Sequence, residues 1–487
     1  MKFSMAHLNI AHLGVPSGVC EIKTPLYRKL FLGFILACVM GISAAMVVCP
    51  PGESVRGDET DSVVNYSDNT WMLISSFLVL IMTPGIALFY GGLINGKNLV
   101  ATIAVCILPM AIIPIMWSFI GYSLAFGVPA TCTPSLGEMN CWYDFIGNPK
   151  DFGLMYNIGA SPALGGNLSI TTTAFFVFQC MFATITPAIL LGSIADRVNF
   201  ASLFIFLPLW HMGVYCPAAH MVWGGGMISQ YGVIDFAGGI VVHMSSGWGA
   251  LAAAIFLGPA KPHAHTPTNV PYVVIGATLL WFGWFGFNAG SALVSNSVAA
   301  HAFVNTNIAA GAAMLAWMLM DQIKGKKFRV SGMCLGIVVG LVGITPAAGF
   351  VNFGAAAIIG IFTAVLCSLA QAGMEKLRFA ADDTLDVFAC HGIGGTIGTF
   401  MTALFQAEAY GAWVDADGAF YGNPLELGKA CLVIVCIAAY YVGATYVIMI
   451  ITNFFISMRV TEEEEEEGLD FSKHYEGSPK GEEEEDA

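Results

Sequence analysis

Two histidines lie several residues inside long apolar stretches. His243 follows Asp235 and a run of apolar and small residues, and His391 follows Asp386 in a similar run. An ionisable ring in hydrocarbon is expensive, so an intramembrane histidine is first read as functional. A facing pair of neutral imidazoles offers donors and acceptors without fixed charge, which suits a path for a small polar solute or a proton relay. The alternative is that each ring only packs against a helix carbonyl.

Aromatic and hydroxyl side chains occur where a cation could be received. Trp223 ends an apolar stretch, and tryptophan is the best cation–π partner. Tryptophan also anchors helices at membrane interfaces, which is the ordinary explanation for a single one. Phe287 and Ser291 are four residues apart and share a helix face. A similar stripe, which usually means packing, is formed by Phe178, Gln179 and Phe182.

Carboxylates precede both histidine-bearing stretches. Asp235 opens the first, where a carboxylate can cap exposed amides and favour the helix dipole. The functional alternative is that Asp235 shapes the field at the mouth of a pore. Asp382, Asp383 and Asp386 are expected to act in the same way before the second stretch.

The composition is that of a membrane protein. Of 487 residues, 56% are hydrophobic and only 11% are charged, against about 25% charged residues in soluble domains. The net charge is −14, and residues 461–487 contribute −11 of it. The rest is nearly neutral and offers no basic face for nucleic acid. We expect residues 461–487 to form an acidic cytoplasmic tail whose glutamate runs are solvated, with the less repetitive 468–474 able to dock.

Eleven segments are apolar and long enough to cross a bilayer core, which needs about 20 residues. The sequence therefore predicts an all-α membrane domain over residues 70–460. His243 and His391 lie at similar depth if spans one to five and six to ten are related by inversion, a 5+5 pseudo-two-fold repeat with one last long helix. The predicted spans are 70–91, 99–126, 168–195, 200–222, 236–257, 272–290, 298–320, 331–350, 354–374, 386–407 and 427–458.

Lysine and arginine set the orientation through the positive-inside rule. With an outward N-terminus and an inward C-terminus, the outer loops hold only Arg56, Lys150 and Lys429. The inner loops then carry Lys97, Arg197, Lys261, Lys324, Lys326, Lys327, Arg329, Lys376, Arg378 and Arg459.

The N-terminal residues are expected to be processed. Residues 1–48 contain a basic flank, an apolar core and small residues typical of a signal peptide, with an uncleaved extra helix as the alternative. Residues 49–69 would then be a polar external segment. Cys132 and Cys141 share a polar loop, and a disulfide between them would require an oxidising outer face.

The motifs together resemble the ammonium transporter family (Amt/Mep/Rh), and its Amt branch more closely than Rh. The run Asp235–Gly247 is similar to that family's signature. The resemblance covers residues 70 to 476. Further matching runs are Pro84–Gly92, His220–Gly226, Gly283–Ser291, Phe303–Thr306 and Asp386–His391.

The resemblance implies a homotrimer in the plasma (inner) membrane with one conduction path in each subunit and no metal or other cofactor. Trp223, Ser291 and Phe182 would bind ammonium, and methylammonium is an open second substrate. Phe182 over Phe287 would form a gate, and His243 and His391 would line the pore. Asp235 and Gln179 would support the site.

Resemblance to bacterial relatives also implies a PII-type regulator on the cytoplasmic side. His474-Tyr475-Glu476 departs from the His-Gly-Glu common in relatives, which weakens this expectation. The leading hypothesis is therefore an ammonium channel or transporter and not an enzyme. The alternatives are an ammonium sensor that signals through its tail, and a membrane enzyme or metal carrier that uses the two histidines.

Overall fold

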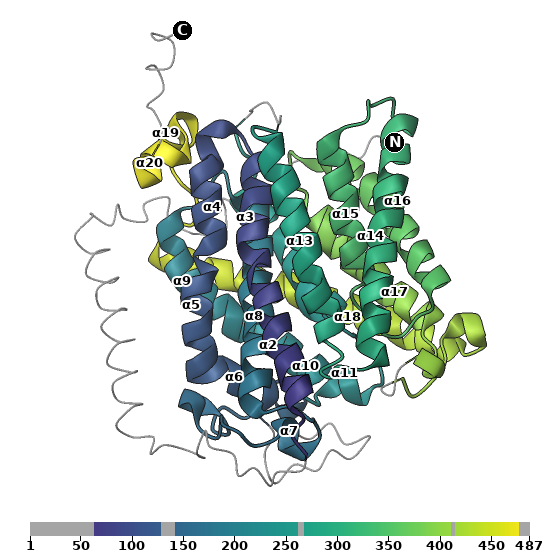
Figure 1. The fold of residues 1–487 in the computed structure, drawn as a ribbon. Coiled ribbons are helices and arrows are strands. Elements are labelled where there is room, and N and C mark those ends of the chain that lie inside the picture. The colour runs from purple at the N-terminus through teal and green to yellow at the C-terminus, as the bar shows by residue number, and fades with distance from the viewer. Residues whose placement is uncertain (1–62, 128–141, 262–266, 411–413, 477–487) are drawn as a thin grey trace, which may run out of the picture.

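The protein is a bundle of membrane-length helices (Figure 1). The computed structural model describes residues 63–127, 142–261, 267–410 and 414–476. In these ranges, β-pairing is limited to isolated bridges, Pro162 with Thr171 and Val198 with Arg459. The multi-pass, all-helical membrane fold predicted from the apolar runs is confirmed. Ten helical stretches are long and apolar enough to span a bilayer: Tyr66–Leu93, Gly96–Phe126, Thr172–Ile194, Phe200–Gln230, Gly239–Leu257, Val270–Gly290, Ser297–Ile323, Phe353–Leu377, Phe388–Phe405 and Pro424–Phe455.

Several of these stretches are built from shorter helices. The bounds of the helices in them are α2 (Tyr66–Leu80), α3 (Met82–Leu93), α4 (Leu99–Ile107), α5 (Pro109–Met116), α6 (Tyr122–Phe126), α8 (Thr172–Leu191), α9 (Leu203–Trp210), α10 (Cys216–Trp223), α11 (Met227–Gln230), α12 (Ser245–Leu257), α13 (Val270–Gly290), α14 (Ser297–Ile323), α16 (Phe353–Leu377), α17 (Ile393–Phe405) and α18 (Pro424–Phe455). The short α7 (Ala163–Gly166) precedes α8.

The predicted eighth span is shorter than the sequence suggested. Its helix, α15 (Val330–Ile344), has 15 residues and packs against α13, α14 and α16. The helix ends because the backbone N–H of Thr345 bonds to Val342 O, and Pro346 follows without an N–H to donate. The described residues therefore contain ten helices of membrane length rather than eleven.

Four membrane helices contain a π-helical turn. Segments η3 (Trp117–Gly121) and η8 (His211–Tyr215) each begin three residues after a proline, Pro114 and Pro208. A proline lacks an N–H and clashes with the preceding turn, which favours a local widening of the helix. The other two, η9 (Gly239–Met244) and η10 (Phe388–Gly392), carry His243 and His391. Such turns are frequent at functional sites.

A buried arginine joins segments distant in the sequence. Arg197, just after α8, is fully buried and donates from Nε to Gly258 O at 2.9 Å. Its guanidinium also donates to Thr384 Oγ1 at 2.7 Å and to Asp382 O, in the segment before η10. Asp196 pairs with it at 2.7 Å. This network fixes the loop after α8 against the start of the second histidine-bearing helix.

The first part of the acidic tail is folded onto the bundle beside α4 (Figure 1). The first glutamate run, expected to be solvated, forms α19 (Glu462–Glu467), because Lys261 and Arg459 pair with its carboxylates. Docking of the following segment is confirmed by α20 (Leu469–His474). The carboxylate of Asp470 accepts the N–H groups of Val100 and Ala101 at the start of α4, at 3.0 and 2.8 Å.

Some predicted features fall outside the described residues. These are the signal peptide in residues 1–48, most of the external segment 49–69, Cys132 and Cys141, and the tail beyond residue 476.

Candidate functional site

A buried carboxylate starts the helix that carries His243. Asp235 is 6% exposed, and its two oxygens accept four backbone N–H groups. The bonds run to Gly238 (2.8 Å), Gly239 (2.7 Å), Ile240 (2.7 Å) and Val241 (3.2 Å). Gly238 has a φ of 121°, a conformation that glycine adopts without strain. Asp235 therefore satisfies the free amides at the start of η9, as its position before the apolar run predicted.

Asp383 does the same for the helix that carries His391. Its carboxylate accepts the N–H groups of Val387 and Phe388 at 3.0 and 2.6 Å. Burial, with the nearby charge of Asp386, raises the pKa of Asp383 to about 7. Asp386, which the sequence also suggested as a cap, instead accepts a hydrogen bond from Gln371 at 2.6 Å.

The prediction for Asp382 is also wrong. Its carboxylate pairs with Arg378 at 2.8 Å and accepts the N–H of Ala260 at 3.0 Å, rather than capping the helix. The spacing of residues in the sequence could have singled out Asp383 as the capping residue among these three aspartates. Asp383 precedes His391 by the same number of residues as Asp235 precedes His243.

Two glycines let the histidine-bearing helices touch. A Cβ on Gly247 would overlap the backbone of Gly392, and a Cβ on Gly395 would lie 2.8 Å from Gly239 O and 2.9 Å from the Cβ of His243. Small residues allow helix backbones to approach closely, as they do in membrane bundles. The contact brings η9 and η10 together.

The two imidazoles meet at that contact. Nδ1 of His391 lies 3.2 Å from Nδ1 of His243, within hydrogen-bonding distance. His243 is 0% exposed and His391 is 2% exposed. Nε2 of His243 faces Thr345 Oγ1 at 3.3 Å. The two histidines that the sequence analysis singled out therefore lie side by side in the fold.

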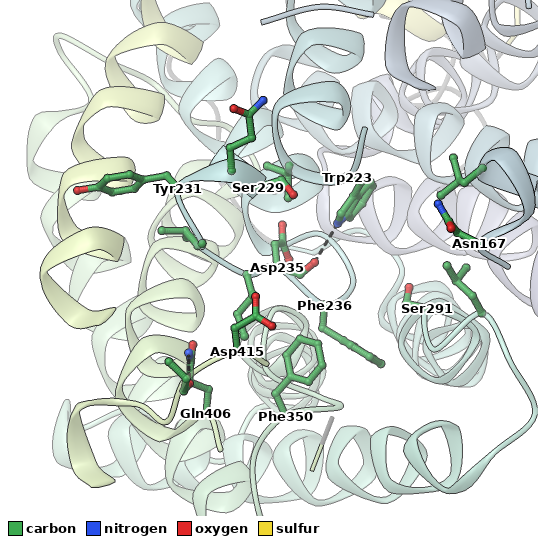
Figure 2. Close-up of a pocket in the computed structure, with 18 of the residues that line it drawn as sticks. Asn167, Trp223, Ser229, Tyr231, Asp235, Phe236, Ser291, Phe350, Gln406 and Asp415 are labelled. Atoms are coloured by element: carbon green, nitrogen blue, oxygen red, sulfur yellow. Dashed lines mark hydrogen bonds between the residues drawn. The ribbon is translucent and has the colours of Figure 1, made fainter. Parts of the chain in front are cut away.

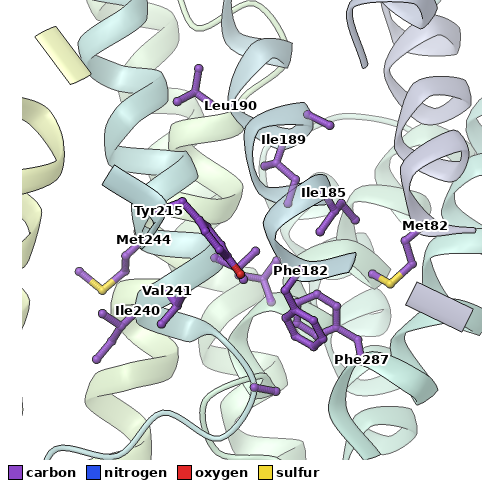
Figure 3. Close-up of a cluster of buried hydrophobic side chains, with 14 of the residues drawn as sticks. Met82, Phe182, Ile185, Ile189, Leu190, Tyr215, Ile240, Val241, Met244 and Phe287 are labelled. Carbon is purple, nitrogen blue, oxygen red and sulfur yellow. The ribbon is translucent and has the colours of Figure 1, made fainter. Parts of the chain in front are cut away.

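A series of aromatic rings in contact leads from the histidine pair toward one end of the bundle. The ring of His243 stacks on Trp284 and Phe287, with centroid separations of 5.4 and 5.9 Å. Phe287 lies against Phe182 at 4.2 Å, and Figure 3 shows these two phenylalanines in contact among apolar side chains. Phe182 in turn meets Trp223 edge-on at 6.0 Å.

A cavity of about 730 Å³ opens at the Trp223 end of this series of rings. Trp223, Ser291, Phe182, Gln179 and Asp235 all line it, and Figure 2 shows Trp223, Asp235 and Ser291 around it. The indole N–H of Trp223 donates to Asp235 O at 2.9 Å, which fixes the ring. Further lining residues are Leu168, Phe175, Val222, Tyr231, Phe236, Leu293, Phe350, Gln406, Asp415, Glu426 and Lys429.

Two polar side chains of the cavity have unused acceptor capacity. The hydroxyl of Ser291 donates to Phe287 O at 2.8 Å, so its oxygen lone pairs remain available. Gln179 is 7% exposed, and within the described residues its Oε1 has no hydrogen-bond partner. Both groups can accept hydrogen bonds from a cation that carries N–H donors.

The structure brings all eight predicted site residues into one continuous arrangement. Trp284 and Thr345, which contact His243 directly, were missed by the sequence analysis. Trp284 lies within a run that the family resemblance did quote, but no spacing rule links it to His243. Thr345 follows a helix end, and nothing in its local sequence points to the site.

Fold and site together define a multi-pass membrane protein whose polar cavity is separated from a buried histidine pair by two phenylalanine rings in contact. The Ammonium Transporter Family model matches residues 70–478. The chain is 43% identical over 413 residues to the ammonium transporter of Bacillus subtilis, covering 84% of this chain and 97% of the relative. It is 40% identical over 416 residues to that of Aquifex aeolicus, covering 85% and 94%.

Solved structures agree with this match. Saccharomyces cerevisiae Mep2 superposes with a TM-score of 0.76 at 33% identity, covering 85% of this chain and 92% of Mep2. A protein described as a sensor Amt protein gives a TM-score of 0.74 at 27% identity, covering 84% and 98%. The chain belongs to the ammonium transporter family, which is a family of transporters and not of enzymes.

Proposed function

We propose that this protein takes ammonium from the outer cavity and conducts it, as ammonia, past the histidine pair. The observation that supports this proposal is an unbroken series of side-chain rings in contact, which begins at a polar cavity and ends at two buried imidazoles. The rings are those of Trp223, Phe182, Phe287, His243 and His391. Transfer of the proton alongside ammonia or its return to the outside are both compatible with this path.

Recruitment at the cavity would combine a cation–π contact with hydrogen bonding. The indole of Trp223 and the ring of Phe182 present aromatic surface to a cation. Ser291 Oγ and Gln179 Oε1 would accept N–H groups of ammonium. Asp235 uses its carboxylate on backbone amides, so it would support the site by holding Trp223 and η9 rather than by binding the ion.

The phenylalanine pair would provide selectivity. Phe182 and Phe287 are both at most 1% exposed and their rings lie 4.2 Å apart, which closes the path to hydrated ions. Ammonium can lose its proton and pass as a neutral molecule. Potassium has no proton to lose and would have to carry its charge through an apolar region, which is prohibitively costly.

The finer architecture follows from the family resemblance and the charge distribution. We propose eleven spans in a 5+5 inverted repeat plus a last helix, with α15 as the short eighth span, in a homotrimer of the plasma membrane. Lys97, Lys261 and Arg459 contact the tail helices, so these cations share one side of the membrane with the tail. By the positive-inside rule that side is the cytoplasm, where a PII-type protein would meet the tail.

A sensor is the second candidate function. The sensor Amt protein among the structural relatives has the same fold, and the tail of this chain is docked on the face that a signalling partner would contact. In that case ammonium would bind in the cavity with little flux.

The test is ammonium-dependent current, measured together with internal pH, in proteoliposomes. The variants are the wild type and the double substitution His243→Ala with His391→Ala. His301→Ala is a matched control, because this ring lies outside the site, with Nε2 2.7 Å from Val351 O. We expect saturable ammonium transport without potassium current in the wild type and control, and its loss or conversion to potassium leakage in the double variant. Ammonium binding without flux in the wild type would favour the sensor.

A further inference from the structure

The hydroxyl of Thr345 lies at the centre of a buried hydrogen-bonding group next to the histidine pair. Its oxygen is 2.9 Å from Trp284 Nε1, 2.8 Å from Leu341 O and 3.3 Å from His243 Nε2. Thr345 is fully buried. A hydroxyl has one proton to donate and two lone pairs to accept with, so these three contacts are allowed in few combinations.

Two of the three contacts have fixed direction. An indole N–H only donates, so Trp284 uses one lone pair of Thr345 Oγ1. A carbonyl only accepts, so the hydroxyl proton points to Leu341 O. Leu341 O is free to accept the hydroxyl proton, because the backbone N–H of Thr345 bonds to Val342 O rather than to Leu341 O. His243 Nε2 therefore faces the second lone pair and must itself carry a proton.

The protonated nitrogen of His243 determines which nitrogen of His391 carries a proton. A neutral imidazole has one N–H, so His243 with its proton on Nε2 has a bare Nδ1. His391 Nδ1, at 3.2 Å, must then carry a proton and donate it to that lone pair. Nε2 of His391 is left bare. Both rings lie in an apolar setting, where the resting pair is neutral because an unpaired charge is expensive.

We propose that Thr345 is a positioning residue that fixes the tautomers of the pair, with the proton on Nε2 in His243 and on Nδ1 in His391. The free lone pair then belongs to His391, the histidine farther from the phenylalanine pair along the ring series. Under the proposed function, His391 Nε2 accepts an N–H of the passing molecule. His243 Nε2, which is occupied by Thr345, cannot accept one.

The reversed pair would need the Thr345 hydroxyl to turn toward His243. Leu341 O would then lose its donor inside the bundle. Leaving a buried acceptor unsatisfied disfavours this state by roughly tenfold or more. Most molecules, roughly nine in ten, are therefore expected in the assigned state.

The test is nitrogen-15 NMR of histidine-labelled protein in lipid bilayers at neutral pH, where protonated and bare ring nitrogens give separate signals. Signals are assigned by their loss in the single His243→Ala and His391→Ala variants. We expect protonated Nε2 for His243 and protonated Nδ1 for His391. The reversed assignment in the wild type would overturn the proposal.

Variants at Thr345 test whether its hydroxyl is the cause. Thr345→Val removes the hydroxyl and should produce a mixture of both tautomers, whereas Thr345→Ser should restore the wild-type spectrum. Thr399→Val is the matched control, because its hydroxyl bonds to Gly395 O at 2.9 Å near the pair without contacting a ring nitrogen. Unchanged tautomers in Thr345→Val would also overturn the proposal.

The NMR readout does not require transport. Absence of flux in the wild type would refute the proposed function and leave the tautomer assignment to be decided by the spectrum. If Thr345→Val fails to fold, the wild-type and Thr345→Ser spectra still decide between the two states.

Discussion

Replacing Asp235 by alanine should destabilise the protein and disrupt the histidine pair together. The carboxylate accepts four backbone N–H groups at 2.7–3.2 Å at the start of η9. Alanine removes both accepting oxygens and with them all four hydrogen bonds. The start of η9 then loses the interactions that set its position, and His243 lies only a few residues further along the same helix.

The size of the effect follows from those four bonds. A buried donor without an acceptor costs about 1–3 kcal/mol. Because Asp235 lines the cavity, water can reach part of this region, so we take the lower end of that range for each of the four N–H groups. The total loss of stability is then about 4 kcal/mol. With an unfolding entropy of about 2.1 cal/mol/K per residue and 487 residues, this corresponds to a melting temperature lower by about 4 °C.

The assay is thermal unfolding of the purified protein combined with ammonium flux in proteoliposomes. Asp235→Asn keeps one of the two accepting oxygens and should fall between the wild type and Asp235→Ala in both measurements. Asp417→Ala is the control, because that carboxylate is exposed and accepts a single amide, Glu408 N, at 3.0 Å. We expect flux to fall at least tenfold in Asp235→Ala, which corresponds to about 1.4 kcal/mol.

Two results would refute this reasoning. If Asp235→Ala melts within about 1 °C of the wild type, the four amides have found other partners and the carboxylate does not hold η9. If the variant is destabilised but retains full flux, the position of η9 does not control the path.

Three further predictions concern buried charges away from the cavity. Arg197→Lys cannot replace the branched donor set and should lower the unfolding free energy by about 3–5 kcal/mol, measured by thermal unfolding; an unchanged melting temperature would contradict this. Burial raises the pKa of Asp383 from 3.8 to about 7, so its protonated form is favoured in the folded state. The free energy of unfolding of the wild type, relative to that of Asp383→Asn, should then be greatest below pH 4 and fall by about 4 kcal/mol as the pH rises through 7. Melting temperatures that change with pH in the same way in both proteins would refute the shift. Glu465→Gln removes the charge of a buried carboxylate that pairs with the partly exposed Arg459, and it should make proteolysis of the tail roughly tenfold faster, with exposed Glu463→Gln as the control; equal rates would show that this pair does not hold the tail.

Local features of the sequence were sufficient to predict the class of protein and most of the residues of the candidate site. Apolar runs of membrane length require helices, because backbone groups in lipid must be satisfied within each segment. A histidine in such a run is costly enough to mark a functional position, which singled out His243 and His391. Asp235 was predictable as a cap because capping depends on residues close in sequence.

The residues that contact the histidines could be identified only in the folded structure. Gly247 and Gly392 set how closely two distant helices cross, and that crossing places the imidazoles 3.2 Å apart. Thr345 reaches His243 because α15 ends at that point, which its apolar sequence did not predict. The glutamate run of α19 is held against the bundle by Lys261, which pairs with Glu462 and Glu466 although it lies far from them in the sequence. In each case the deciding interaction joins segments far apart in the chain, and periodicity and local spacing carry no information about such contacts.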